Sequence, residues 1–440
     1  MKLSGNAKKF LGNSGWMIGQ QLYYMMLQLV IGSLSARYLG PSNYGLLNYG
    51  ASIISFFTII CKLGMDGVII NEMIKAPEKR GSYLGSALVL RLCASITSLF
   101  LIIGIIRILE PGHTVLYWIT FLQSIAVVLQ TYEIFNYWFQ LNLKMKYVSL
   151  GTMLAQTIVG IWRIALLATK ASVYFFALSS SIQFFVCAVV VIIFFRRERD
   201  KNLKLRFNKE DSLYLLRNSY HFIITGIAVT FYMQIDKIMI GKLMDSTAVG
   251  IYTAAVTIAA LWEFIPNALV NSARPLIIEL RGKNYQAYIK RFQELLLAVS
   301  LLSVCVSIGI MVLGRIVVRI LYGVTYADAY WPLSILIWST GFAMIGTTRN
   351  IWLVAEGYNK YSKYLVFVGA VVNFTLNMIA IRIWGIIGAA ITTLVSQFVV
   401  AFISPLFFKE IRGFIKIYLE AFQYLGDLVN IAKRYLNRAK

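Results

Sequence analysis

The long apolar stretches of this sequence carry a small set of ionisable side chains, which are the residues best able to do chemistry. They are Lys62, Asp66, Arg91, Glu133, Arg163, Asp236, Lys237, Glu263 and Arg349. A charge that faces lipid near the centre of a bilayer costs about 2.5–3.5 kcal/mol, so each is expected to face a protein interior or a hydrated cavity. Cations in such a cavity would bind an anion, and the planar guanidinium fork suits phosphate oxygens.

Some of these charges also have a purely structural explanation. Lys62 and Asp66 are four residues apart and could neutralise each other across one helical turn. Arg91 and Arg163 have no neighbour of opposite charge in the sequence, which favours a cavity with a positive field. Glu133 is a candidate partner for Arg91. The sequence leaves the choice between structural ion pairs and a binding site open.

Uncharged polar residues form two stripes on the expected helices. The first repeats every seven residues, a spacing that returns to nearly the same helix face, and consists of Ser14, Gln21, Gln28 and Ser35. The second stripe consists of Thr230, Gln234 and Lys237. Such stripes either join helices through hydrogen bonds or line a cavity. The cation in the second stripe favours a cavity.

The composition predicts a helical membrane protein. Hydrophobic residues make up 59% of the 440 residues and charged residues 14%, against about 25% charged in a soluble domain. Twelve apolar runs reach the ~20 residues that a membrane-spanning helix needs, and no alternating pattern of a membrane barrel is present. The expected spans are 13–36, 44–70, 83–109, 115–140, 149–169, 172–195, 218–241, 247–273, 292–321, 330–354, 363–382 and 385–408.

A strongly basic run from Arg196 to Arg206 divides these spans into two sets of six. The sequence therefore predicts an N-terminal lobe over 1–195, a connection over 196–217 and a C-terminal lobe over 218–408. Most of the 42 Lys and Arg residues lie in the termini and in the connections that follow even-numbered spans. This asymmetry places both termini and the basic connection in the cytoplasm.

The last segment, 409–440, is too charged to span the membrane but keeps apolar residues near helical spacing. It is predicted to be an amphipathic cytoplasmic tail lying on the membrane surface, with a partly disordered basic tail as the alternative. Arg349 lies near the cytoplasmic end of its span, where a long side chain can reach the surface.

An internal repeat supports two related lobes. The stretch from Ala36 to Leu47 aligns without a gap on the stretch from Gly241 to Tyr252, with a cation before the turn and a glycine after it. Six spans separate the two stretches, so the lobes share one orientation. They are expected to be related by a pseudo-twofold axis along the membrane normal.

Few residues of this sequence suit enzymatic chemistry. The four cysteines lie inside apolar runs without paired spacing, and the two histidines, His113 and His221, are far apart. There is no acidic metal cluster, no Ser/His/Asp arrangement and no nucleotide-binding G-x-x-x-x-G-K-[ST] motif. We therefore expect no catalytic residue, no metal or other cofactor and no nucleic-acid partner.

Four runs carry a resemblance to a known family. They are 36–45 (ARYLGPSNYG), 62–66 (KLGMD), 236–241 (DKIMIG) and 384–390 (WGIIGAA). They resemble bacterial polysaccharide repeat-unit flippases of the Wzx type, in the multidrug/oligosaccharidyl-lipid/polysaccharide exporter superfamily. The resemblance implies twelve helices in two six-helix lobes of a bacterial inner-membrane protein. It also implies alternating-access transport of undecaprenyl-diphosphate-linked oligosaccharides to the outer leaflet, for O-antigen or capsule.

The resemblance implies a type of site, but it does not identify the individual residues that form the site. For a diphosphate group, the leading candidates are Arg91 and Lys237, followed by Arg163 and Lys62, with Gln21, Gln28 and Gln234 lining the cavity. Coupling to H+ or Na+ is expected, and Asp66, Glu133, Asp236 and Glu263 are the candidate carriers. Membrane lipids, polysaccharide polymerase and chain-length components are candidate partners.

Two other functions remain as alternatives. A drug or other lipid exporter of the same superfamily would share the fold, although an exporter of cations should have a negative cavity. A membrane-embedded polymerase fits less well because the sequence lacks catalytic groups. The sugar composition, the kind of polymer, the coupling ion and the oligomeric state are left open.

Overall fold

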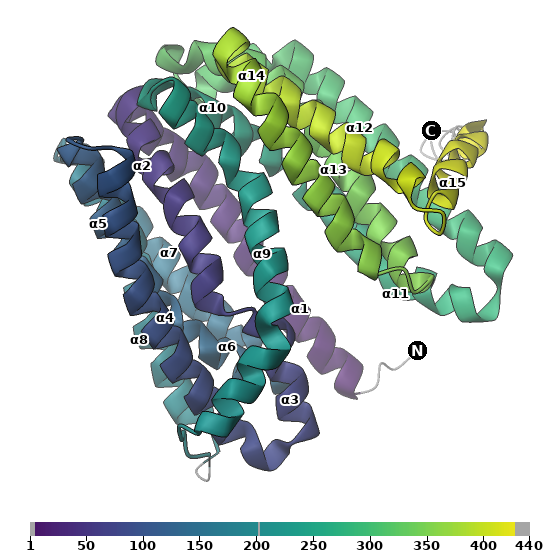
Figure 1. The fold of residues 1–440 in the computed structure, drawn as a ribbon, viewed down its shortest axis with the longest axis horizontal. Coiled ribbons are helices and arrows are strands. Elements are labelled where there is room, and N and C mark those ends of the chain that lie inside the picture. The colour runs from purple at the N-terminus through teal and green to yellow at the C-terminus, as the bar shows by residue number, and fades with distance from the viewer. Residues whose placement is uncertain (1–4, 201–202, 427–440) are drawn as a thin grey trace, which may run out of the picture. The chain divides into compact units, whose positions relative to one another are not determined.

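The computed structural model describes residues 5–200 and 203–426, and this part of the chain is helical throughout, with no strand (Figure 1). Ten continuous helical segments are long and apolar enough to cross a membrane. Two of them, Gly12–Lys62 and Lys360–Phe407, are each interrupted by a non-helical glycine, Gly40 and Gly385, and so contain two spans apiece. The predicted all-α, twelve-helix membrane architecture is confirmed.

The helices follow the expected spans closely. In chain order they are α1 (Gly5–Leu27), η1 (Gln28–Gly32), α2 (Ser33–Lys62), η2 (Met65–Gly67), α3 (Ile69–Lys75), η3 (Pro77–Lys79), α4 (Arg80–Leu109), α5 (Thr114–Leu129), η4 (Gln130–Glu133), α6 (Ile134–Leu141), α7 (Met145–Ala168), α8 (Val173–Glu198), α9 (Lys209–Leu243), α10 (Ser246–Leu261), α11 (Phe264–Lys283), α12 (Tyr285–Tyr322), η5 (Val324–Ala329), α13 (Tyr330–Ala355), α14 (Lys360–Phe398), η6 (Val399–Ile403), η7 (Ser404–Phe407), α15 (Gly413–Ala421) and η8 (Phe422–Tyr424).

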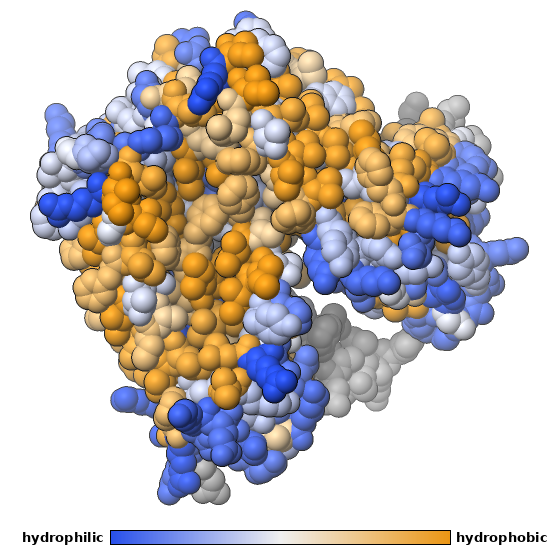
Figure 2. All heavy atoms as spheres, viewed as in Figure 1, coloured by the Kyte–Doolittle hydropathy of each residue, from blue (hydrophilic) through white to orange (hydrophobic). Residues whose placement is uncertain are grey.

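Contacts divide the chain into two compact units. Unit 1 comprises residues 1–241 and 245–250, and unit 2 comprises residues 242–244 and 251–440. Apolar side chains cover the exposed helix faces of unit 1, and hydrophilic residues gather at the helix ends (Figure 2). This is the distribution of a membrane-spanning bundle. The residues of the predicted connection and α9 as far as Gly241 fall within unit 1, while the predicted domain limits stay a prediction.

An aromatic cluster packs one end of unit 1. Phe135, Trp138 and Phe139 of α6 pack on Phe195 near the end of α8, with ring centroids 4.4, 5.5 and 6.5 Å from that of Phe195, respectively. All four side chains are buried. They fix the second half of the fourth span, which is broken at η4, against the sixth span.

In unit 2, α13 packs against both α12 and α14. The start of the predicted tail also belongs to this bundle: α15 packs on α12, and Phe414 is 0% exposed beside Trp352. The first half of the tail is therefore held by protein as well as being amphipathic. Residues 427–440 of the predicted tail lie outside the described residues.

The two stretches of the internal repeat meet in space. A Cβ atom added to Gly45 would lie 1.6 Å from the carbonyl oxygen of Ser246, and one added to Gly250 would lie 2.0 Å from that of Pro41. Gly45 corresponds to Gly250 in the repeat, and Pro41 corresponds to Ser246. The contact is thus reciprocal, as expected when equivalent surfaces meet across a twofold axis.

Candidate functional site

The site begins where the second span breaks. Helix α2 ends at Lys62 because Leu63 (φ 52°) and Gly64 (φ 61°) adopt left-handed backbone conformations. The chain then makes the short helix η2, which carries Asp66. Lys62 and Asp66 therefore do not lie one turn apart on a continuous helix, and the predicted pairing between them is wrong.

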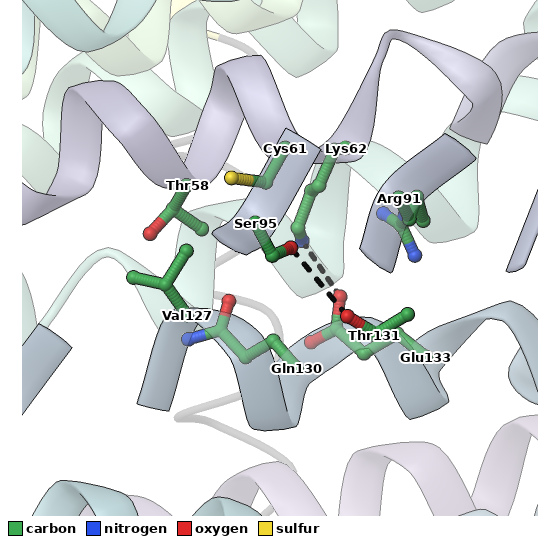
Figure 3. Close-up of a pocket in the computed structure, with 9 residues that line it drawn as sticks. All are labelled: Thr58, Cys61, Lys62, Arg91, Ser95, Val127, Gln130, Thr131 and Glu133. Carbon is green, nitrogen blue, oxygen red and sulfur yellow. Dashed lines mark hydrogen bonds and ion pairs between the residues drawn. The ribbon is translucent and has the colours of Figure 1, made fainter. Parts of the chain in front are cut away.

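A small polar cavity lies between α2, α4 and the η4 break of the fourth span (Figure 3). It has room for about one water molecule. Its lining residues are Thr58, Cys61, Lys62, Arg91, Ser95, Val127, Gln130, Thr131 and Glu133. Lys62 and Glu133 point toward each other across it, with their charged atoms 3.2 Å apart.

Arg91 is the most deeply buried charge of this site, with 2% of its surface exposed. Its nearest carboxylate oxygen is Asp66 Oδ1, 3.7 Å from Nη2, which is too far for a hydrogen bond. The Tyr137 hydroxyl donates a hydrogen bond to the same Asp66 oxygen, and the guanidinium lies 5.8 Å from the Tyr137 ring centroid. Asp66 is thus held by two groups from other elements.

The guanidinium of Arg91 has unmet hydrogen-bonding capacity. None of Nε, Nη1 and Nη2 has a hydrogen-bond acceptor among the described residues. A buried cation without good acceptors costs several kcal/mol, so a protein keeps one where it serves a purpose that an apolar residue cannot. The three nitrogens therefore have donors left over for an oxygen acceptor, and the adjacent cavity has room for about one water.

The ion pairs differ from the expected ones. Glu133 pairs with Lys62 rather than with Arg91, and Asp66 pairs with Arg91 rather than with Lys62. The break after Lys62 exchanges the partners, because it turns Asp66 away from the α2 axis and toward α4. Two cations and two carboxylates then form one network that is neutral overall.

A second polar group lies on α9 and α2. Gln234 Oε1 accepts hydrogen bonds from Ser52 Oγ at 3.2 Å and from Lys237 Nζ at 3.4 Å. Lys237 is half-buried and the neighbouring Asp236 is buried. Within unit 1, Gln234 of the predicted stripe on the seventh span therefore faces the second span, and Lys237 binds to Gln234.

The remaining predicted residues are not part of the Arg91 cavity. Arg163 is half-buried on α7, and Gln21 is exposed on α1. Gln28 folds its amide over Gly32, where an added Cβ would lie 3.1 Å from Gln28 Cδ. Glu263 belongs to unit 2 and occupies the break between α10 and α11. The binding and coupling roles assigned to all these residues stay predictions.

Several residues of the site were not predicted. Tyr137, Ser95, Gln130 and Thr131 contribute hydroxyl or amide groups from the third and fourth spans. The run Gln130–Glu133 is a cluster of polar residues inside an otherwise apolar segment, and it coincides with the helix break. That local polarity is a signal from which the break and its cavity lining could have been found.

Arg349 also departs from expectation. It does not reach the membrane surface but is 3% exposed, and its Nη1 donates to the carbonyl oxygens of Val400 at 2.6 Å and Ala401 at 3.0 Å. These carbonyls belong to the π-helical turn η6, in which the usual backbone hydrogen bonds are displaced. The arginine is therefore a structural tie within unit 2.

The sequence is similar to those of known membrane proteins. A putative O-antigen transporter of Escherichia coli (strain K12) is 21% identical over 396 residues, covering 88% of this chain and 93% of that protein. A probable low-salt glycan biosynthesis flippase, Agl15 of Haloferax volcanii, is 25% identical over 183 residues, covering 41% of this chain and 39% of that protein.

Solved structures show the same fold. The lipid II flippase MurJ in an inward closed conformation matches with a TM-score of 0.70 and 16% identity, covering 96% of this chain and 93% of that one. An inward-facing multidrug resistance MATE transporter of the MOP superfamily matches with a TM-score of 0.67 and 15% identity, covering 93% and 96%. Residues 10–280 match the family described as polysaccharide biosynthesis protein. The chain belongs to this family.

Proposed function

We propose that the protein is a transporter, not an enzyme, that flips diphosphate-linked oligosaccharides on an undecaprenyl lipid from the cytoplasmic to the outer leaflet of the bacterial inner membrane. Both termini lie in the cytoplasm in this proposal, as the distribution of Lys and Arg favours. The supporting comparisons are the family match and the similarity to an O-antigen transporter and a glycan flippase. Polymerase and chain-length components are proposed partners.

The observation that carries the proposal is the unmet hydrogen-bonding capacity of Arg91. A diphosphate offers several anionic oxygens, and a guanidinium binds two of them at once. The adjacent Lys62 adds a second cation, 3.2 Å from the only carboxylate with which it pairs in this part of the chain. A cationic drug would meet repulsion from both groups, which disfavours the drug-exporter alternative.

The network also offers a way to couple binding to an ion. Asp66 and Glu133 neutralise Arg91 and Lys62, respectively. When diphosphate oxygens replace the carboxylates on these cations, Asp66 and Glu133 lose their partners. Each carboxylate is then free to take up H+ or Na+. Binding of the anion and uptake of the coupling ion would occur at one place.

Charge reversal at Arg91 tests the anion site. We expect Arg91→Ala to reduce transport and Arg91→Glu to reduce it further, because attraction at ~4 Å is worth about 4 kcal/mol at an effective dielectric of 20 and becomes repulsion. Arg91→Lys should retain part of the activity, since it keeps the charge but loses the fork. The measurements are surface polysaccharide and protein abundance in cells whose own copy is deleted. Arg107→Glu, at an exposed position of the same helix, is the matched control.

A purely structural role would give a different result. If Arg91 only neutralises Asp66, the exchanged pair Arg91→Asp with Asp66→Arg should restore both abundance and transport. The proposed role predicts restored abundance with impaired transport, because the cation no longer lies in the cavity. Normal polysaccharide output from an abundant Arg91→Glu protein would refute the anion site.

A further inference from the structure

Gly81 and Gly85 of α4 form a surface without side chains, here called the seat. The chain that follows the sixth span packs directly on it. A Cβ atom added to Gly81 would lie 2.2 Å from the carbonyl oxygen of Lys204, and one added to Gly85 would lie 2.4 Å from that of Arg206. Both contacts are to backbone, which cannot move aside as a flexible side chain can. The extended residues 203–208 therefore lie directly on the backbone of α4.

Hydrogen bonds hold this segment in the seat. The Arg206 amide donates to the Gly81 carbonyl oxygen at 3.2 Å. The Asn208 amide donates to Ser86 Oγ at 3.0 Å, and Ser86 Oγ donates to the Asn208 carbonyl oxygen at 3.1 Å. These bonds are spaced along α4 in step with the two glycines, so the segment is registered on the helix as well as contacting it.

The start of α9 is fixed by charged groups. The Asp211 carboxylate accepts a hydrogen bond from Ser82 and lies 3.5 Å from Lys79 Nζ. The Tyr214 hydroxyl donates to Glu72 Oε2 at 3.0 Å. The partners of α9 thus come from α3, η3 and α4, three separate elements at one end of unit 1.

Close backbone packing continues further along α9. A Cβ atom added to Gly64 would lie 2.6 Å from the Ser219 carbonyl oxygen and 2.8 Å from the Ile223 amide nitrogen. Gly64 is also part of the helix break after Lys62, and it is the residue that precedes η2. One contact therefore joins the path of α9 to the geometry of the anion site.

We infer that residues 203–226, here called the strap, are a fixed part of unit 1 and position Gln234 and Lys237 for the substrate. Helix α9 is continuous from Lys209 to Leu243. Contacts at its first residues therefore fix the rotation of the helix about its axis and the position of Gln234 and Lys237 along that axis. Gly81 and Gly85 are positioning residues in this account. The inference rests on the proposed function for the role of Lys237. It makes the last part of the predicted connection a docked segment, whereas an undocked connection could act as a hinge between the predicted lobes.

Alanine substitutions in the seat test the inference without changing any charge. Gly81→Ala and Gly85→Ala should each raise the amide exchange rates of Arg206 and Asn208 at least tenfold and lower transport. Gly104→Ala is the matched control on the same helix, because its added Cβ meets no atom within 4 Å. Exchange is measured by mass spectrometry in nanodiscs, and transport as surface polysaccharide per unit of protein.

A cross-link separates a docked strap from a hinge. In a transport-competent background without native cysteines, Ser82→Cys and Asp211→Cys are joined by oxidation. The inference predicts that the joined protein transports at the rate of its reduced form, because the two positions never separate. It also predicts that joining them restores transport to the Gly85→Ala variant, which a general loss of stability would not allow.

Two outcomes would overturn the inference. One is rapid exchange of the Arg206 and Asn208 amides in the unmodified protein. The other is a joined protein that stops transporting and recovers with reductant, as a hinge requires. Failure of every variant, including the unmodified protein, to move a lipid-linked oligosaccharide would instead refute the proposed function, and the exchange rates would still decide whether the strap is docked.

Discussion

The two ion pairs of the site, Lys62 with Glu133 and Arg91 with Asp66, differ in how well each is satisfied, and Asp66 is the one member that does not line the cavity. Lys62 and Glu133 approach to 3.2 Å and remain partly exposed, so both keep some hydration. Arg91 is buried and reaches Asp66 only at 3.7 Å. The first pair is close to the ordinary strength of a surface ion pair, whereas the second leaves donors unused. The free energy for binding an anion should therefore come mainly from Arg91.

This difference leads to a double-mutant prediction at Lys62. Lys62→Met and Glu133→Gln should each lower stability, and the double variant should lose about 1 kcal/mol less than the sum of the two. Thermal or denaturant unfolding in detergent measures the coupling. The exposed pair Lys283 and Glu279 serves as the control, with coupling near zero. Coupling near zero at Lys62 as well would mean that the cavity pair contributes nothing to stability.

Glu72 gives a pH dependence outside the membrane spans. Hydrogen bonding from Lys75, and less strongly from Tyr214, holds the pKa of this carboxyl below its usual value, against the effect of burial. A carboxyl with a lowered folded pKa stabilises the folded state above its unfolded pKa of about 4.3, and the contribution disappears as pH falls through the folded value. Wild type should therefore exceed Glu72→Gln in stability near pH 7.

The same comparison should converge in acid. As pH falls below the unfolded pKa of about 4.3 and through the lower folded pKa, the Glu72 carboxyl becomes protonated, so the difference in unfolding midpoint between wild type and Glu72→Gln should shrink. Glu78→Gln, which changes a neighbouring carboxyl for which no ion pair is recorded among the described residues, is the control. A difference that stays constant from pH 7 to pH 3.5 would contradict the assignment.

The residue types of the site were predictable, but their pairings were not. A charged side chain that faces lipid has a high free-energy cost. For this reason the sequence alone identifies Lys62, Arg91 and Glu133 as groups that face the protein interior. Their partners depend on the left-handed backbone at Leu63 and Gly64, which ends α2 one residue after Cys61 and before Asp66. Sequence periodicity assumes an unbroken helix, so it placed Asp66 over Lys62.

Broken helices are the features of the elements that matter most for the site. The second span breaks at Leu63, the fourth at η4 and the eighth after Leu261. Each break frees backbone groups from the helical ladder, and such breaks are tolerated at membrane depth where they are buried in protein or line a hydrated cavity. Polar side chains cluster at the break of the fourth span, around Glu133.

The π-helical turn η6 in the last span also has displaced backbone hydrogen bonds, and Arg349 donates to two of its carbonyl oxygens. Arg349→Ala removes two hydrogen bonds to backbone carbonyls, and we expect unit 2 to lose on the order of 3 kcal/mol, since hydrogen bonds from charged donors contribute ~1.5–3 kcal/mol each. Thermal unfolding in detergent is the measurement. Arg315→Ala, an exposed residue that lies over the Tyr330 ring, should change stability little. Equal losses in the two variants would exclude the tie.

At the scale of the whole molecule, the lengths of the apolar runs were sufficient to predict the all-helical fold, while the orientation predicted from charge asymmetry stays a prediction. Each of the twelve runs is long enough to span, and lipid permits only helices or closed barrels. Docking of residues 203–208 on α4 was not predictable, because a basic connection without a periodic pattern resembles a solvated loop. Its seat is visible only when Gly81 and Gly85 are placed against Lys204 and Arg206.

The reciprocal glycine crossing gives a prediction about the transport cycle. Ser42 Oγ and Ser246 Oγ are 3.1 Å apart beside Gly45 and Gly250. Residues 246–250 lie in unit 1, but α10 continues from Gly250 into unit 2. If transport requires α10 to move relative to α2, a covalent bond between Ser42 and Ser246 should oppose the motion, whereas one within the strap should not.

We therefore expect the disulfide formed by Ser42→Cys and Ser246→Cys to arrest transport, and reductant to restore it. The two single-cysteine variants, treated with the same oxidant, should transport normally. The pair Ser82→Cys and Asp211→Cys provides the active cross-linked comparison in the same assay. Arrest at the crossing together with activity of the joined strap would locate the moving contact at the repeat, where residues 41–45 and 246–250 pack backbone to backbone. Continued transport by a fully oxidised Ser42→Cys, Ser246→Cys protein would mean that residues 41–45 and 246–250 stay together throughout the cycle.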